Sequence, residues 1–142
     1  MPKIHFEKIV KAERNKVFDI ATDYEEFQKK IPQYITSIRV RSVRDNVAVI
    51  EEHLQLAGKE LVMMTKHVTK YPETHEIFVI GGDAKGSYIL EHYQSIKNTT
   101  KITIDADIKL KGALKIVGFF GKGKITKGFV KMMDEFANIA ES

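Results

Sequence analysis

The chain has 142 residues, a length typical of one domain, so we expect residues 1–142 to form a single domain. It contains no cysteine, which excludes disulfides, thiolate metal sites and cysteine nucleophiles. The formal net charge of +4 is modest, with both signs mixed, as on an ordinary soluble surface with a weak preference for anionic partners. No stretch reaches the roughly 18 apolar residues of a membrane span, and the first residues lack the apolar run of a signal peptide. We therefore expect a cytoplasmic protein.

The N-terminal region predicts one strand followed by two short helices. Residues 4–11 alternate between apolar and polar side chains, as a half-buried strand does. Three apolar residues then share one face of a helix over residues 13–21: Val17, Phe18 and Ala21. A second short helix reaches about residue 30 and ends before Pro32, because the residue preceding a proline is pushed out of the helical region.

After Pro32 the hydrophobic pattern changes to a period of two residues, which indicates strands. The pattern predicts six further strands: residues 38–43, 47–56, 61–70, 75–80, 87–96 and 101–110. Only short connections separate them, such as the tight-turn pair Asp45-Asn46. Parallel strands need long crossovers, so these connections predict antiparallel hairpins.

The C-terminal segment predicts a long helix with one apolar stripe. Ten residues follow the stripe at spacings of three and four: Leu114, Val117, Gly118, Gly121, Ile125, Gly128, Phe129, Met132, Phe136 and Ile139. Glycine inside a helix costs about 1 kcal/mol relative to alanine. We therefore expect these glycines to leave room for a cavity where the helix faces the sheet.

Residues 118–124 come within one residue of a phosphate-binding loop, Gly-x-x-x-x-Gly-Lys. The motif requires Ser or Thr next, whose hydroxyl holds the magnesium ion, but Ile125 stands there. The motif also needs a parallel strand–loop–helix unit, whereas the pattern predicts antiparallel strands. We therefore reject nucleotide binding.

Motifs for metal binding and serine hydrolysis are also missing from the sequence. His75-Glu76 begins like the His-Glu-x-x-His zinc motif, but Val79 replaces the second histidine. The other histidines are spread singly over separate predicted strands, and no Gly-x-Ser-x-Gly elbow is present. We predict no metal site and no cofactor.

Three segments of the chain resemble a known superfamily: "KIVKAERNKVFDIATDYEEFQKKIPQYI" near the start, "GSYILEHYQSIKNTTKITIDADIKL" near the end, and "KGALK" before the last helix. Together with the order of elements, they are similar to the START-like (SRPBCC, helix-grip) superfamily, in its polyketide cyclase/dehydrase and coenzyme-Q-binding branch. The resemblance covers essentially the whole chain. It implies an α+β helix-grip fold, in which a curved seven-stranded antiparallel sheet wraps around a long C-terminal helix. It also implies an internal cavity for an apolar or amphipathic small molecule.

The alternation of each strand indicates which side chains face such a cavity. If Ile50 and Leu54 face inward, Glu52 does too, and the same reasoning applies along the later strands, although a single bulge would reverse it. We predict a ligand site formed by ten residues of the strands and the helix stripe: Glu52, Met63, His67, Tyr88, Leu90, His92, Gly121, Ile125, Gly128 and Met132.

We favour a binding function for transport or sensing of a lipid, quinone or polyketide-like molecule, with no catalytic residue assigned. The alternative is a cyclase/dehydratase-type enzyme that uses Glu52, His67, Tyr88 or His92. An apolar cavity raises the pKa of a carboxyl group and lowers that of an imidazole, which suits proton transfer.

A third reading is an interaction module that acts through the basic C-terminal helix. Six lysines there, most often a solvated face, could with Phe119 and Phe120 contact an anionic membrane surface: Lys111, Lys115, Lys122, Lys124, Lys127 and Lys131. Nucleic acid is the weaker partner, because no nucleic-acid-binding motif accompanies the charge.

Overall fold

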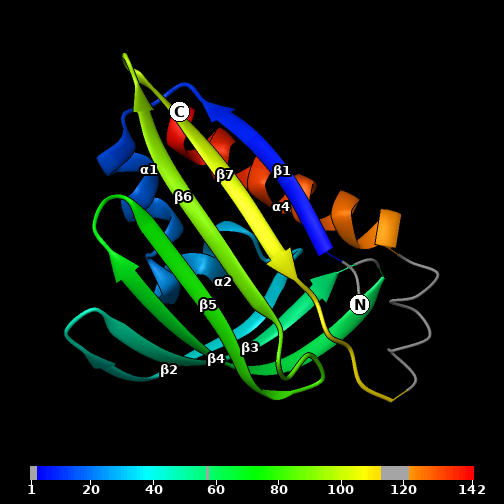
Figure 1. Cartoon of the computed structure of the whole chain (residues 1–142). Helices are drawn as coiled ribbons and strands as arrows, with labels where there is room; N and C mark the ends of the chain where they lie inside the picture. The colour runs from blue at the N-terminus through cyan, green and yellow to red at the C-terminus, as the bar shows by residue number, and fades with distance from the viewer. Residues whose placement is uncertain (1–2, 57, 113–121) are drawn as a thin grey trace.

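The computed structural model describes residues 3–56, 58–112 and 122–142, and Figure 1 shows how their strands and helices follow one another. In chain order the elements are β1 (Lys3–Val10), α1 (Arg14–Ala21), the 3-10 helix η1 (Tyr24–Glu26), α2 (Phe27–Lys30), β2 (Ile35–Arg44), β3 (Val47–Leu56), β4 (Lys59–Lys70), β5 (Thr74–Gly82), β6 (Tyr88–Ile96), β7 (Thr99–Asp107) and α4 (Lys122–Glu141). Because η1 and α2 run together, this order confirms the predicted succession of one strand, two short helices, six strands and a long C-terminal helix.

The seven strands form one sheet in the order β1-β7-β6-β5-β4-β3-β2. Every neighbouring pair is antiparallel, and hairpins connect the strands from β2 to β7 in sequence. The described strands therefore lack the parallel unit that a phosphate-binding loop requires. Residues 118–121 of the loop-like segment lie outside the described residues, whereas Lys124 and Ile125 belong to α4.

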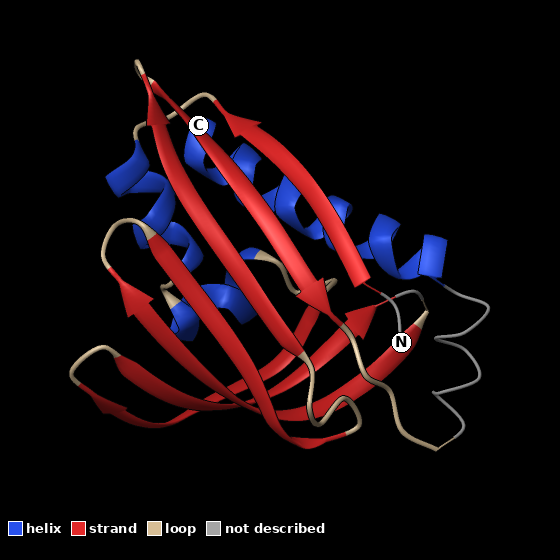
Figure 2. Cartoon of the chain, viewed as in Figure 1, coloured by secondary structure: helices blue, strands red, loops and turns tan. Residues whose placement is uncertain are grey.

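Irregularities in the strand pairing accompany the curvature of the sheet. The β2–β3 pairing shifts register twice, between Ile35 and Ser37 and again between Val40 and Ser42. The β4–β5 pairing shifts where Met64 and Thr65 pair with Gly81 and Val79, which leaves Ile80 as an extra residue. Bulges of this kind bend a strand and increase its twist. The result is a sheet with a concave face large enough to receive helices (Figure 2).

The helices lie on the concave side of the sheet (Figure 2), and α1 and α4 each bury one stripe of residues. In α1 the buried residues are Val17, Phe18 and Ala21, as the sequence predicts. In α4 the fully buried stripe consists of Ile125, Phe129, Met133, Ala137 and Ala140. The predicted stripe is therefore confirmed at Ile125 and Phe129, but its C-terminal half is rotated toward Met133 and the alanines.

We predict that Gly82→Ala destabilises the protein more than Gly58→Ala does. Both glycines have positive φ, 91° at Gly82 and 78° at Gly58, so either alanine incurs about 1–2 kcal/mol of backbone strain. Only at Gly82 would the new Cβ meet another atom, 2.1 Å from the carbonyl oxygen of Val62. We expect an additional loss of about 1–3 kcal/mol from this overlap, measured by urea unfolding. Equal losses in the two variants would contradict the close approach of β4 and β5.

Candidate functional site

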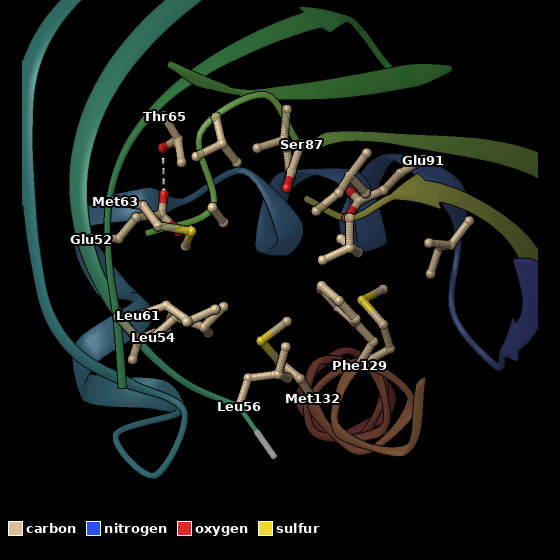
Figure 3. Close-up of a pocket in the computed structure, with 18 of the residues that line it drawn as sticks. Glu52, Leu54, Leu56, Leu61, Met63, Thr65, Ser87, Glu91, Phe129 and Met132 are labelled. Atoms are coloured by element: carbon tan, nitrogen blue, oxygen red, sulfur yellow. Dashed lines mark hydrogen bonds between the residues drawn. The ribbon is translucent and has the colours of Figure 1, made fainter. Parts of the chain in front are cut away.

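A cavity of about 100 Å³ lies between the concave face of the sheet and helices α2 and α4 (Figure 3). A buried water needs about 10–15 Å³ on this scale, so the cavity has room for a small organic molecule. Most of its wall is apolar, with side chains from all layers of the fold: Phe6, Phe27, Ile31, Leu54, Leu56, Leu61, Met63, Ile77, Val79, Ile89, Ile104, Ile108, Leu110, Ile125, Phe129, Met132 and Phe136. The cavity therefore suits a hydrophobic occupant.

Four titratable side chains cross the sheet side of this wall, and we call them the acid–histidine chain: Glu52, His67, His75 and Glu91. Each comes from a different strand, in the order β3, β4, β5 and β6, which is also their order in the sheet. All four are buried, with exposed fractions of 2–9%. Charged side chains are almost never fully buried unless they are paired. The contacts among these four residues therefore determine the chemistry of the cavity wall.

At the β3 end of the chain, Glu52 is held by two neighbours on β4. The Thr65 hydroxyl donates a hydrogen bond to Glu52 Oε2 at 2.6 Å, and Figure 3 shows this contact at the cavity wall. Nε2 of His67 lies 3.1 Å from the same carboxylate oxygen and 2.9 Å from the Thr65 oxygen. The imidazole N–H is thus directed at the Glu52–Thr65 pair.

At the β6 end, Glu91 is held in a similar way. Nδ1 of His75 lies 2.7 Å from Glu91 Oε1, and the Tyr93 hydroxyl donates to the same oxygen at 2.7 Å. The two halves meet between the imidazoles, where His67 Nδ1 and His75 Nε2 are 2.8 Å apart. An unbroken series of hydrogen bonds therefore connects the two carboxyl groups.

The number of protons in this series follows from its geometry. Three hydrogen bonds join the four groups of the acid–histidine chain, and each needs one proton. With both carboxyl groups ionised, the two imidazoles together hold three N–H protons and one positive charge. The acid–histidine chain then carries a net charge of −1 within a mostly apolar wall.

The surroundings favour ionised carboxylates. Burial raises the pKa of Glu52, but hydrogen bonds from His67 and Thr65 and the nearby imidazole charge outweigh burial, so the pKa lies below its usual range. Burial likewise raises the pKa of Glu91, and the charge and hydrogen bond of His75, with the Tyr93 hydroxyl, bring it below its usual range. Burial lowers the pKa of His67 more than Glu52 raises it. His67 Nδ1 is therefore the acceptor in the bond with His75.

Two tyrosines cover the acid–histidine chain. The Tyr24 ring on η1 packs on His67 with ring centres 4.6 Å apart, and its hydroxyl lies 3.5 Å from His75 Nε2. Burial, followed by the charges of Glu91 and Glu52, raises the pKa of Tyr24. Burial and Glu91 also raise the pKa of Tyr93. Both hydroxyls therefore stay protonated, and Tyr93 acts as a permanent donor to Glu91.

The structure places half of the ten predicted ligand residues in the cavity wall. The residues that line it are Glu52, Met63, His67, Ile125 and Met132. They come from β3, β4 and α4, where the alternation or the helix stripe was unambiguous. That they contact a ligand stays a prediction.

The predicted orientation of β6 is wrong. Ile89 and Glu91 line the cavity and Tyr93 is fully buried, so Tyr88, Leu90 and His92 point to the opposite face. There Tyr88 donates to Glu76 Oε2, and burial together with this bond raises the pKa of Tyr88 to about 12. Apolar or aromatic residues occupy both faces of β6, so alternation alone could not select the inward one.

The prediction for the helix glycines is not supported where the structure describes them. Gly128 is half-buried on α4 but is not one of the described residues that line the cavity. Gly121 lies outside the described residues. The space instead lies among larger side chains such as Phe129 and Met132.

Sequence reasoning missed the β5–β6 half of the acid–histidine chain. In the sequence His75 stands out only as the start of an incomplete zinc motif, although its alternation with Ile77 and Val79 places it on the inward face. Glu91 lies on the inward face of β6, which the predicted orientation of this strand places outward. Tyr24 lies in a 3-10 helix, whose short length gives no face pattern.

Neither a metal site nor a membrane helix is found in the described parts of the chain. Within residues 3–56, 58–112 and 122–142, no group of three acidic or histidine side chains is arranged to hold a metal ion. In the acid–histidine chain the facing nitrogens of His67 and His75 are hydrogen-bonded to each other. No described helix is long and apolar enough to cross a membrane.

The basic surface of α4 gives no further support to a membrane contact. Lys124, Lys127 and Lys131 are exposed, as lysines of a solvated helix face are. Phe119 and Phe120, the apolar part of the proposed patch, lie outside the described residues. This contact stays a prediction.

No protein-family model and no curated protein matches the sequence. Solved structures do match the fold over nearly the full length of both chains. The protein TTHA0849 from Thermus thermophilus has a TM-score of 0.84 at 11% identity, covering 96% of this chain and 95% of its own. The ZhuI aromatase/cyclase from a Streptomyces species has a TM-score of 0.80 at 10% identity, covering 98% and 93%. A START superfamily protein from Mycobacterium smegmatis has a TM-score of 0.79 at 12% identity, covering 98% and 99%.

The chain has the helix-grip fold of these structures. The likeness at these identities concerns the backbone, and it confirms the fold that the sequence resemblance implies. Because so few residues are shared, the character of the cavity follows from the residues of this chain, foremost the acid–histidine chain.

We predict that His67 contributes stability to the folded protein that is lost as the pH drops from 7 to 5.5. The pKa of His67 is lowered from the ordinary 6.5 in the folded state, so below about pH 6.5 the unfolded chain binds a proton that the folded chain does not. A single such group changes stability by up to about 1.4 kcal/mol per pH unit. The carboxyl groups, whose folded pKa values are also lowered, add to this loss only below about pH 4.5.

The variant His67→Gln isolates this contribution. We expect it to lower stability at pH 7 by about 1–3 kcal/mol, because buried partners lose a hydrogen bond, and to reduce the decline toward pH 5.5. His53→Gln is the control, since His53 lies on β3 with its side chain 41% exposed beside Glu60. Urea unfolding at both pH values measures the slopes. An unchanged slope in His67→Gln would show that His67 is not held neutral.

Proposed function

We propose that the protein binds a hydrophobic or amphipathic small molecule in the cavity between the sheet and α4, for transport or sensing. The observation that carries this proposal is the cavity itself. Protein interiors are packed with few voids larger than a water, whereas here apolar side chains from the sheet, α2 and α4 surround a space of about 100 Å³. A space of this kind is the usual form of a small-molecule site.

The chemistry of the wall supports a lipid, quinone or polyketide-like ligand. The apolar side chains favour rings or alkyl chains, and the acid–histidine chain provides one polar strip for orientation. Two of the similar structures carry the names aromatase/cyclase and START superfamily protein. These names are in keeping with a ligand of this type.

We predict that Leu61→Trp blocks the cavity while Val62→Trp does not. The two residues are neighbours on β4, but Leu61 lines the cavity and is 6% exposed, whereas Val62 faces outward and is 46% exposed. Nile red, a neutral apolar dye, should bind the parent with a rise in fluorescence. We expect Leu61→Trp to weaken this binding by about tenfold or more, since the indole occupies the space of the dye.

The control variant Val62→Trp adds the same side chain to the opposite face of the sheet. Its Nile red affinity should match that of the parent, and thermal unfolding should show that both variants are folded. Parent protein that fails to bind Nile red, or equal binding by both variants, would contradict the proposed cavity site.

The acid–histidine chain favours a second candidate function, general acid–base catalysis of the dehydratase or cyclase kind. The continuous hydrogen bonds from Glu52 to Glu91 allow a proton taken up at one carboxylate to be replaced at the other. In a dehydration, Glu52 takes the proton from the carbon next to a ligand carbonyl, and the imidazole proton that His75 directs at Glu91 passes through Glu91 to the departing hydroxyl. A C–H and a C–O bond break, a C=C bond forms and water leaves, with no oxidant or reductant required.

This second candidate predicts turnover of a simple β-hydroxy ketone. With 4-hydroxy-4-phenylbutan-2-one as probe, dehydration yields benzalacetone, which is followed by its ultraviolet absorbance. If the chain acts as acid and base, Glu91→Gln should lower the rate by about 10²–10⁴. Glu76→Gln, which removes the same charge on the outer face beside Tyr88, should leave it unchanged. Absence of turnover in the parent would leave binding as the favoured function for this chain.

A further inference from the structure

Each carboxylate of the acid–histidine chain uses only one of its two oxygens in the chain. The hydrogen bonds of Glu52 from Thr65 and His67 all end on Oε2. Those of Glu91 from His75 and Tyr93 all end on Oε1. The other two oxygens, Glu52 Oε1 and Glu91 Oε2, make no hydrogen bond with any described residue.

These two remaining oxygens are accessible. Among the described residues, no buried side-chain oxygen or nitrogen lacks a hydrogen-bond partner, so neither oxygen is sealed in the core. The side chains of Glu52 and Glu91 both line the cavity and both retain an exposed fraction of 11%, against 2–3% for the two imidazoles. The histidines are thus enclosed, while the carboxylates at the two ends reach the cavity.

Figure 3 shows the separation of the two ends. Glu52 lies on one side of the cavity with Thr65 and Met63, and Glu91 lies across from it beyond Ser87. A ligand that lies along the sheet wall therefore meets one carboxylate at each end of the acid–histidine chain. The wall offers two separate contact points rather than one.

The other polar groups of the wall offer few hydrogen-bond donors. The hydroxyls of Thr65 and Tyr93 donate to the carboxylates. The Ser87 hydroxyl donates to the Lys109 carbonyl oxygen at 3.1 Å. The N–H groups of His67 and His75 are already engaged in hydrogen bonds of the acid–histidine chain. Lys59 is the one lysine or arginine among the described lining residues, and it is exposed at the start of β4.

We propose that the cavity selects ligands that donate hydrogen bonds, through a hydroxyl, phenol or ammonium group, and excludes ligands with a carboxylate inside the cavity. The free oxygens of Glu52 and Glu91 accept these donors. This inference rests on the proposed binding function and specifies the ligand's polar groups. The net charge of −1 on the chain repels an anion, and an ionised carboxylate has no proton to offer one.

Four probes with the same naphthalene ring test this selectivity: 2-naphthol, 2-(aminomethyl)naphthalene, 2-methoxynaphthalene and 2-naphthoate. Their dissociation constants are measured at pH 7.5 by displacement of Nile red from the parent protein. The first two donate hydrogen bonds, the third has no donor and the fourth is an anion. We expect at least one donor probe to bind about 10–100-fold tighter than 2-methoxynaphthalene, the usual range for a hydrogen bond to a charged group. We expect 2-naphthoate to bind at least about tenfold more weakly than 2-methoxynaphthalene.

Variants identify the oxygens responsible. Glu52→Gln and Glu91→Gln remove the charge and add an amide donor, so the preference for the donor probe should shrink and 2-naphthoate should gain affinity. Glu76→Gln is the matched control, because it removes one negative charge from the same sheet outside the cavity lining. It should leave the order of the four probes unchanged. If a cavity variant does not fold, the probe series on the parent still decides.

The possible results separate the two proposals. If Nile red and all four probes fail to bind, the proposed binding function falls and this inference falls with it. If Nile red binds but 2-methoxynaphthalene binds as tightly as both donor probes, the inference alone is overturned. Tightest binding by 2-naphthoate, lost in Lys59→Ala, would also overturn it and would assign an anion site at Lys59. Preference for the hydroxyl probe alone or the ammonium probe alone supports the inference and names the donor.

Discussion

The placement of two carboxylates in an apolar cavity wall is the constraint on which the rest of this site depends. An ionised carboxylate removed from water costs several kcal/mol unless partners compensate it, so Glu52 and Glu91 require His67 and His75 between them. His75 stands directly opposite Glu91 across β5 and β6. A slip of one residue between any two of these strands would turn one member outward and break the series. The acid–histidine chain therefore requires one particular register for every strand pair from β3 to β6.

The acid–histidine chain also connects the cavity to the part of the core that α1 covers. Tyr93 is fully buried and packs against Phe18 of α1, with ring centres 4.9 Å apart, while its hydroxyl holds Glu91. On the other side, Tyr24 of η1 covers the two imidazoles. The short helices after β1 therefore fix the orientation of polar groups on β4, β5 and β6. These helices therefore shape the polar part of the cavity wall as well as the core.

The sequence predicted the fold more completely than the site. Period-two alternation and short connections defined the antiparallel strands, and the inward positions of Glu52 and His67 followed because their strands have one apolar face. In β6, Tyr88 and Leu90 on one face compete with Ile89 and Tyr93 on the other, so the pattern cannot choose. For this reason the sequence does not indicate Glu91 as a cavity residue. Hydrogen bonds across strands, such as those joining His67, His75 and Glu91, depend on register, which side-chain patterns do not encode.

Binding and catalysis would make different demands on the same four residues. A ligand that donates to Glu52 Oε1 and Glu91 Oε2 uses only the ends of the chain and disturbs none of its internal hydrogen bonds. Because the described buried polar groups are already satisfied within the protein, such a ligand finds its acceptors preorganised and adds contacts without breaking others. Catalysis would instead require every bond of the chain to exchange its proton during a turnover. The permanent donors Thr65 and Tyr93 stabilise the ionised ends, which favours the static role over the exchanging one.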